Sequence, residues 1–188
     1  MKKILGILSI FLVALIAVSF AGCIDDSGNV TNNTTNNTTN NSTGINPPLE
    51  FEFDESMVIA DPMPEGFEHI ATQSVMANEE VSGITDELPG TAGYYAYDGS
   101  NVYLTVYECD DADAAQGYIN QMKQETARLQ GEVSSVTVNE HDAALLKTKS
   151  VIGTEISIIA WTRGNLLVVV DGPAGYDAIK TLADASGL

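Results

Sequence analysis

Apolar side chains are distributed unevenly along this 188-residue chain, and their distribution predicts separate regions. Residues 4–22 form an apolar run without a charged side chain, whereas residues 29–43 contain one apolar residue, Val30. From residue 49 onward, apolar residues alternate with polar ones or recur at helical spacing, as in a folded domain. The expected regions are a signal segment (1–22), a stalk (23–48) and a single domain (49–188).

The most regular part of the domain is a predicted β-hairpin. Aromatic and β-branched residues fill positions 93–97 and 102–108, and the sequence between them, residues 98–101, is typical of a turn. Pairing across a four-residue turn places Tyr97 opposite Val102. Strand residues then alternate between two faces of the hairpin.

One face of this hairpin is expected to be core and the other to carry tyrosines. Tyr95, Leu104 and Val106 lie on the predicted core face. The opposite face carries four hydroxyl-bearing residues: Tyr94, Tyr103, Thr105 and Tyr107. Such a face can bind a sugar, a peptide or a partner domain, because Tyr combines flat apolar area with a polar tip. The alternative is that the chain's own loop, over residues 78–89, covers it.

An amphipathic helix is expected after the hairpin. Asp110 and Asp111 supply an N-cap, and apolar residues recur at helical spacing from Ala115 until Gly131 ends the segment. The remaining pattern predicts an early edge strand over 67–75, strands over 133–138, 143–150, 156–162 and 166–171, and a closing helix over 176–185.

The order of these elements predicts an α+β fold. Strands joined by short turns favour a mainly antiparallel sheet, and we expect the two helices to pack on one face of it. A shift of 64 positions aligns Tyr97 with Trp161 and Val106 with Val170 without a gap. Two interpretations fit this alignment: a duplication into two β-β-α repeats, or convergence of two ordinary hairpin-plus-helix segments.

The N-terminal segment predicts export. Lys2 and Lys3 precede the apolar run, which is the order of a signal peptide. Residues 19–23 read Ser-Phe-Ala-Gly-Cys and resemble the signal-peptide box of lipoproteins, with Phe20 where that family usually has Leu. The resemblance implies cleavage before Cys23 and a lipid on its thiol. The alternative is an uncleaved membrane anchor, because about 17 to 25 apolar residues span a bilayer.

The segment after Cys23 predicts a disordered, glycosylated stalk. Residues 29–43 are almost entirely Asn and Thr, so they cannot offset the entropy of ordering. Acceptor triplets for N-glycosylation begin at Asn29, Asn32, Asn33, Asn36, Asn37, Asn40 and Asn41. A lipobox-like cysteine before an Asn/Thr stalk resembles the surface lipoproteins of archaea, methanogens especially. That resemblance implies a domain held at the outer face of the cell membrane.

Charge makes nucleic acid and anionic lipid poor partners. Loss of Lys2 and Lys3 with the signal leaves 6 of the 8 basic residues against 26 acidic ones and changes the formal net charge from −18 to −20. Binding to phosphates depends on Lys and Arg, which are few and scattered along this sequence. Such an acidic chain suits a solvated surface or attraction to cationic partners.

Few residues offer catalytic chemistry. The chain lacks a phosphate-binding glycine loop, a Cys-x-x-Cys pair, a His-Glu-x-x-His helix and a Gly-x-Ser-x-Gly elbow. His69 and His141 are the only histidines, and Cys109 is the only thiol besides Cys23. Carboxylates beside Cys109 should disfavour its thiolate, so we expect a poor nucleophile.

The acidic cluster after the hairpin has two interpretations. Glu108, Asp110, Asp111 and Asp113 suggest a cation site, but the spacing lacks the Gly and the distal Glu of a calcium loop. Helix capping explains carboxylates at this position equally well and is the preferred interpretation.

These observations predict no catalytic residues, no metal site and no cofactor. The leading hypothesis is a membrane-anchored surface lipoprotein whose extracytoplasmic domain binds an unknown protein or small molecule without catalysis. The alternatives are an extracytoplasmic hydrolase or metal-dependent enzyme with a site assembled only in the fold, and a structural component of the cell envelope.

Overall fold

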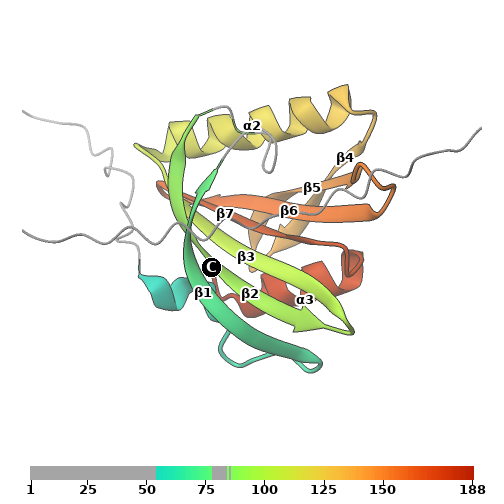
Figure 1. Ribbon diagram of the computed structural model, residues 1–188. Helices are drawn as coiled ribbons and strands as arrows, with labels where there is room; N and C mark the ends of the chain where they lie inside the picture. The colour runs from blue at the N-terminus through green and yellow to red at the C-terminus, as the bar shows by residue number, and fades with distance from the viewer. Residues whose placement is uncertain (1–53, 78–83, 85) are drawn as a thin grey trace, which may run out of the picture. The chain divides into compact units, whose positions relative to one another are not determined.

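The computed structural model describes residues 54–77, 84 and 86–188 (Figure 1). The signal segment, Cys23, the seven candidate glycosylation sites and most of the predicted loop over 78–89 lie outside the described residues. None of the described helices is long and apolar enough to span a lipid bilayer.

The described residues form a seven-stranded antiparallel sheet with two α-helices, so the α+β prediction is confirmed. The strand order is β1-β2-β3-β7-β6-β5-β4. In chain order the elements are the 3-10 turn η1 (Glu55–Val58), β1 (Phe67–Ala77), β2 (Leu88–Tyr97), β3 (Ser100–Glu108), α2 (Ala112–Arg128), β4 (Glu132–Val138), β5 (His141–Lys149), β6 (Glu155–Arg163), β7 (Leu166–Gly172) and α3 (Tyr176–Ala185). The predicted edge strand is confirmed as β1.

The predicted hairpin is β2–β3, and its register differs from the expectation. Tyr97 pairs with Ser100 rather than with Val102. The cause is a two-residue turn, because Asp98 and Gly99 both adopt positive φ, at 45° and 75°, as Asp-Gly does in tight hairpins. The register error is two residues, so every side chain stays on its predicted face.

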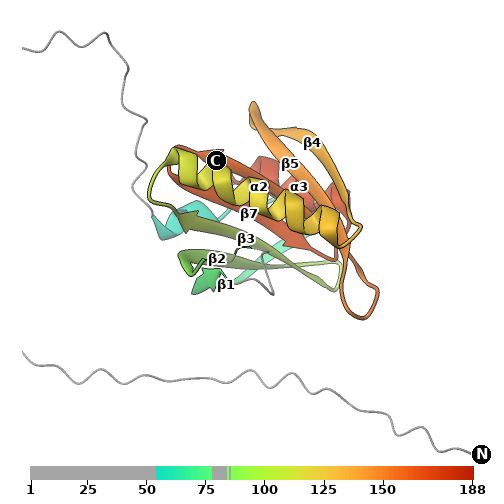
Figure 2. The same cartoon turned by 90° about the horizontal axis from the view of Figure 1, so that it is seen from above.

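The two helices pack on opposite faces of the sheet, and the prediction that both lie on one face is wrong. Val168 and Val170 of β7 share a core with α3, whereas Leu167 and Val169 share a second core with α2. Because successive strand residues point to opposite faces, the two cores lie on either side of the sheet. Figure 2 shows α2 in front of the sheet and α3 behind it.

The central strand β7 explains why both faces are covered. Residues 166–170 are all buried, and a continuous apolar strand is typical of a sheet with packing on both sides. Trp161 of neighbouring β6 is fully buried in the α3 core.

The alignment of the sequence with itself at a shift of 64 positions agrees with the faces of the strands but not with the positions of the helices. Val106 and Val170 both face the α3 core. However, β3 and β7 are adjacent antiparallel strands, so a symmetric duplication would place both following helices on one face. The two β-β-α repeats therefore stay a prediction that the helix positions do not support.

Candidate functional site

Tyr94 of β2 and Tyr103 of β3 form the centre of the candidate site. They are directly paired across the hairpin, and their rings lie edge to face with centroids 5.1 Å apart and planes at 89°. Such edge-to-face contacts are favourable beyond simple burial of area. Both residues are half-buried, so each keeps some surface in contact with solvent.

Asp171 of β7 extends this pair into a row across three neighbouring strands. Tyr103 pairs with Asp171, and Ile158 of β6 pairs with Asp171 on its other side. Burial of the carboxyl group raises the pKa of Asp171 to about 7, although the residue as a whole is partly exposed. Among the described residues, no hydrogen bond or ion pair involves this carboxyl group.

The sequence did not single out Asp171 as a site residue. It follows five apolar positions and looks like the polar end of a strand. The available signal was its place directly after a continuous apolar run, because carboxylates are almost never buried without a partner. Only the pairing of β7 with β3 brings it beside Tyr103.

The other two residues of the predicted tyrosine face, Thr105 and Tyr107, are buried. Tyr107 shares the α2 core with Ile84. Burial raises the pKa of Tyr107 to about 12, and the negative charge of Asp171 adds to the shift. Both residues contribute to packing, so the solvent-accessible part of the face narrows to Tyr94 and Tyr103.

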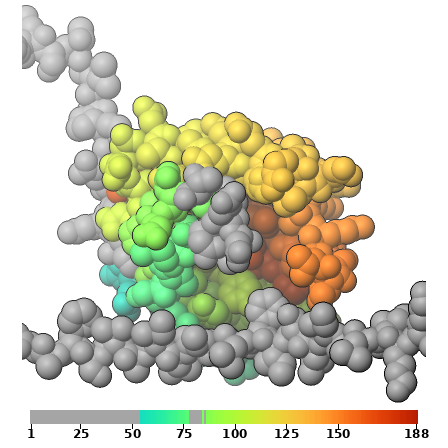
Figure 3. Space-filling model, turned by 45° about the horizontal axis from the view of Figure 1, so that its top comes forward, coloured from blue at the N-terminus to red at the C-terminus, as the bar shows by residue number. Residues whose placement is uncertain are grey.

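Helix α2 borders this face. It packs against β4, β5, β6 and β7, and in Figure 3 it runs in yellow along the top of the view, with the green of the β1–β3 half beside it. The Tyr118 hydroxyl donates a 3.3 Å hydrogen bond to Asp86, just before β2. One turn further along α2, the buried Oε1 atom of Gln121 has no hydrogen-bond partner among the residues that the structure describes.

The two histidines do not share a site. His69 lies on edge strand β1, where its ring is 5.2 Å from that of Tyr95 and its Nε2 is 3.1 Å from Thr72 Oγ1. His141 begins β5, five strand positions away in the sheet. Neighbouring strands are about 4.8 Å apart, so roughly 24 Å separates the two strands. Catalysis that needs both imidazoles is excluded.

Cys109 is a structural thiol. Its exposed fraction is 5%, and its pKa is raised to about 11, chiefly by burial and further by the carboxylates of Asp110, Asp111 and Glu108. The prediction of a poor nucleophile is confirmed, with burial rather than charge as the main cause.

The acidic cluster caps helix α2. Asp111 Oδ1 accepts a 2.7 Å hydrogen bond from the N–H of Ala114, which confirms the capping interpretation. No group of three or more His, Cys, Asp or Glu side chains among the described residues is placed to hold a metal ion.

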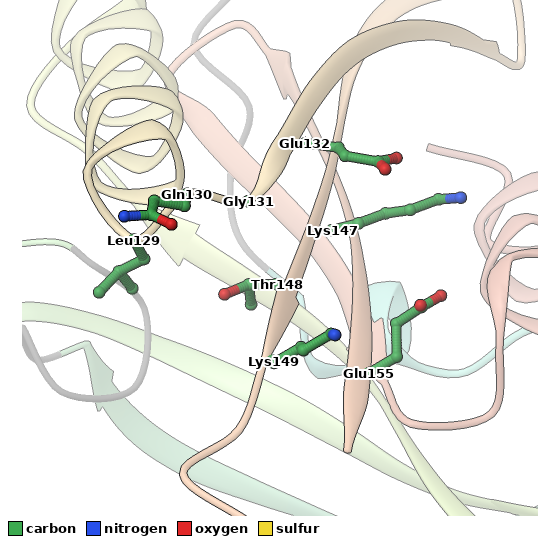
Figure 4. Close-up of a pocket in the computed structure, with 8 residues that line it drawn as sticks. All are labelled: Leu129, Gln130, Gly131, Glu132, Lys147, Thr148, Lys149 and Glu155. Carbon is green, nitrogen blue, oxygen red and sulfur yellow. The ribbon is translucent and has the colours of Figure 1, made fainter. Parts of the chain in front are cut away.

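A polar pocket of about 500 Å³ lies at the C-terminal end of α2 (Figure 4). Lys147 of β5 is paired with Glu132 of β4, and Lys149 with Glu155 of β6. Opposite charges in directly paired positions are mildly stabilising. The two lysines are therefore balanced by two carboxylates, and the pocket offers an anion no net positive charge.

No family model, no curated protein and no solved structure was found to match this chain, so its function has to be inferred from its own residues.

Proposed function

We propose that this chain is a surface lipoprotein whose extracytoplasmic domain binds a partner or small ligand without catalysis. The observation that carries the proposal is the half-buried, edge-to-face pair of Tyr94 and Tyr103 in one row with Asp171. Tyrosine is enriched in binding surfaces because a rigid ring supplies contact area at a low entropy cost. The row offers such area together with one charged group that can give specificity.

The proposed location rests on the N-terminal sequence. Lys2 and Lys3, the apolar run over 4–22 and Cys23 support export and anchoring at the outer face of the cell membrane. Two acyl chains, or a retained apolar helix, give a stable anchor. The Asn/Thr segment over 29–43 would hold the domain away from the membrane, extended by glycans at some of its acceptor sites.

One observation favours the enzymatic alternative. A carboxyl group with a pKa of about 7, such as that of Asp171, has the proton affinity of a general acid or base. Its two directly paired neighbours, Tyr103 and Ile158, supply no second carboxylate, histidine or activated nucleophile. A binding function therefore accounts for the residues of this row better than a hydrolase function does.

A crosslinking experiment on the intact lipoprotein in its own membrane tests the proposal. We expect Tyr103→Ala to lose the crosslinked partner that the wild-type chain captures. Val151→Ser is the matched control, because Val151 is 101% exposed on the β5–β6 turn and also loses apolar surface. Equal capture by the wild-type chain and both variants would overturn the tyrosine face as the binding surface and favour a structural envelope role.

A small ligand would escape crosslinking and needs a second measurement. Native mass spectrometry of the full-length chain, purified in mild detergent from its own cells, should then show a bound compound that Tyr103→Ala loses and Val151→Ser keeps. Turnover that disappears in Asp171→Asn would instead support the hydrolase alternative.

A further inference from the structure

The row that contains Asp171 has a fixed geometry. Direct pairing places Tyr94 beside Tyr103 and Tyr103 beside Asp171 on one face of the sheet. Side chains in directly paired positions have Cβ atoms roughly 5 Å apart. The carboxyl group therefore lies next to a corner made by two perpendicular aromatic rings.

The carboxyl group of Asp171 has no partner within the described part of the chain. Buried charges are normally paired, because loss of hydration is costly unless an opposite charge or several hydrogen bonds replace it. Here the neighbours along the row are a tyrosine and Ile158, and neither carries a positive charge. An amide or an aliphatic residue would fill this strand position at a lower cost to stability.

The aromatic rings of the row and the net charge of the chain both favour a cation. The open face of an aromatic ring carries negative potential and attracts ammonium groups. The Tyr94 and Tyr103 rings meet edge to face, so the ring that presents its edge has neither of its faces occupied by the other ring. The chain as a whole has a formal net charge of −18, which draws cations toward it and repels anions.

We propose that the row of Tyr94, Tyr103 and Asp171 binds a substituted ammonium ion, with Asp171 as its counter-ion and the tyrosine rings as its aromatic contact. This inference rests on the proposed binding function and specifies the chemistry of its ligand. The ammonium group belongs either to a small organic cation or to a basic side chain of a partner.

The protonation state of Asp171 gives the site a characteristic pH dependence. In the free protein, burial sets the pKa of Asp171 at about 7. A bound cation favours the charged carboxylate, so binding releases a proton and weakens as the pH falls below about 7. Among the described residues, the titratable side chains on this face beside the carboxyl group are Tyr94, Tyr103 and Tyr107, and burial raises the pKa of Tyr107 to about 12. On α2, Glu125 is paired with Arg128.

A matched pair of probes separates charge from shape. Choline and its neutral isostere 3,3-dimethylbutan-1-ol have the same outline and differ in one positive charge. Titration of the full-length protein in detergent, followed by calorimetry at pH 8, is expected to show binding of choline at least about tenfold tighter than of the alcohol. Nα-acetyl-lysine amide, measured in parallel, distinguishes a basic side chain from a quaternary ammonium ion as the preferred form.

Variants of the row make the test specific. Asp171→Asn is expected to weaken binding of the preferred probe at least about tenfold and to remove its pH dependence between pH 6 and 8. Tyr103→Phe should keep binding, because the ring remains, whereas Tyr103→Ala should lose it. A thermal melt of each variant confirms that it is folded, and Val151→Ser again serves as the control.

The outcomes separate this inference from the proposed function. Equal binding of choline and the alcohol, or affinity that is unchanged in Asp171→Asn, overturns the ammonium site. The same holds if neither ammonium probe binds at 10 mM. If the natural partner is still lost with Tyr103→Ala but kept with Asp171→Asn, the binding function stands and only its cationic chemistry fails.

Discussion

The hydroxyl group of Tyr95 donates a 2.6 Å hydrogen bond to the carbonyl oxygen of Val58 in η1. The same hydroxyl oxygen accepts a 2.9 Å hydrogen bond from the N–H of Ala60. Tyr95 is 1% exposed and Val58 is fully buried, so these bonds satisfy backbone groups that water cannot reach. The Tyr95 side chain on β2 thus holds Val58 and Ala60, at the end of η1, against the sheet.

Removal of this hydroxyl group should destabilise the fold. Tyr95→Phe leaves the Val58 carbonyl and the Ala60 N–H unsatisfied in the core, which we expect to lower the free energy of unfolding by about 2 kcal/mol. Tyr97→Phe is the control, because Tyr97 lies on the same strand and its hydroxyl group makes no such bond to the described part of the chain. Equal urea midpoints for the two variants would contradict the assigned role.

Two glycines should respond oppositely to alanine. A Cβ on Gly93 would lie 2.1 Å from the carbonyl oxygen of Val58, so Gly93→Ala has to displace η1. For Gly117, inside α2, no described residue other than its chain neighbours and the adjoining helix backbone has an atom within 4 Å of the same position. We expect Gly93→Ala to destabilise the domain by about 2 kcal/mol or more and Gly117→Ala to stabilise it by up to about 1 kcal/mol. Thermal melts of both variants measure the difference.

Asp171 should make the domain less stable as the pH rises. Its pKa is about 7 in the folded protein, whereas an unperturbed aspartate has a pKa of 3.8, so the folded state binds the extra proton between these values. Stability is then lost from about pH 4 to pH 7 and is constant above it. The full shift corresponds to roughly 4 kcal/mol, and partial exposure of the residue reduces this to about 2 kcal/mol.

Asp171→Asn isolates this effect from the other carboxylates. We expect the variant to match the wild-type protein at pH 4.5 and to be about 2 kcal/mol more stable at pH 8. Urea unfolding at both pH values measures the difference. A constant difference across this range would show that the Asp171 carboxyl group titrates as in the unfolded chain.

Cys109 should be nearly inert while the domain is folded. Because burial raises its pKa from 9.0 to about 11, the thiolate fraction at pH 8 falls roughly 100-fold. In a Cys23→Ser background, we expect a disulfide reagent to label Cys109 at least 100-fold more slowly in buffer than in 8 M urea. Comparable labelling rates would contradict the burial of this thiol.

Cys23 should determine membrane attachment. Cys23→Ser removes the sulfur that would carry the lipid, so we expect release of the protein into the medium or retention of the uncut signal. Fractionation and intact mass of the wild-type and Cys23→Ser proteins distinguish these results. A lipid-labelled product of unchanged mass from the variant would refute lipidation at this cysteine.

Local patterns in the sequence predicted most of the sheet. Alternation over residues 93–97 and 102–108 assigned each hairpin residue to the correct face, since a two-residue error in register preserves alternation. The acidic residues at the start of α2 were correctly interpreted as caps because capping depends only on neighbouring residues.

Relationships between distant residues were not predictable in the same way. The opposite placement of the helices is seen only in the two cores of the assembled sheet, and no local pattern encodes the strand order that puts β7 between β3 and β6. Asp171 acquires its place beside Tyr103 through the same long-range pairing. The sequence showed that Asp171 is a polar residue after an apolar run, but it did not show which residues of the neighbouring strands lie beside it.

The central position of β7 also affects how the chain can be made. Residues 166–172 are the last strand to be synthesised, yet they join the β1–β3 half of the sheet to the β4–β6 half. Until they emerge, β3 and β6 each expose an unpaired edge, which is a template for association with other chains. A nascent chain must therefore be shielded until β7 has emerged, and a protein that crosses a membrane unfolded completes this sheet only after residue 172 has crossed.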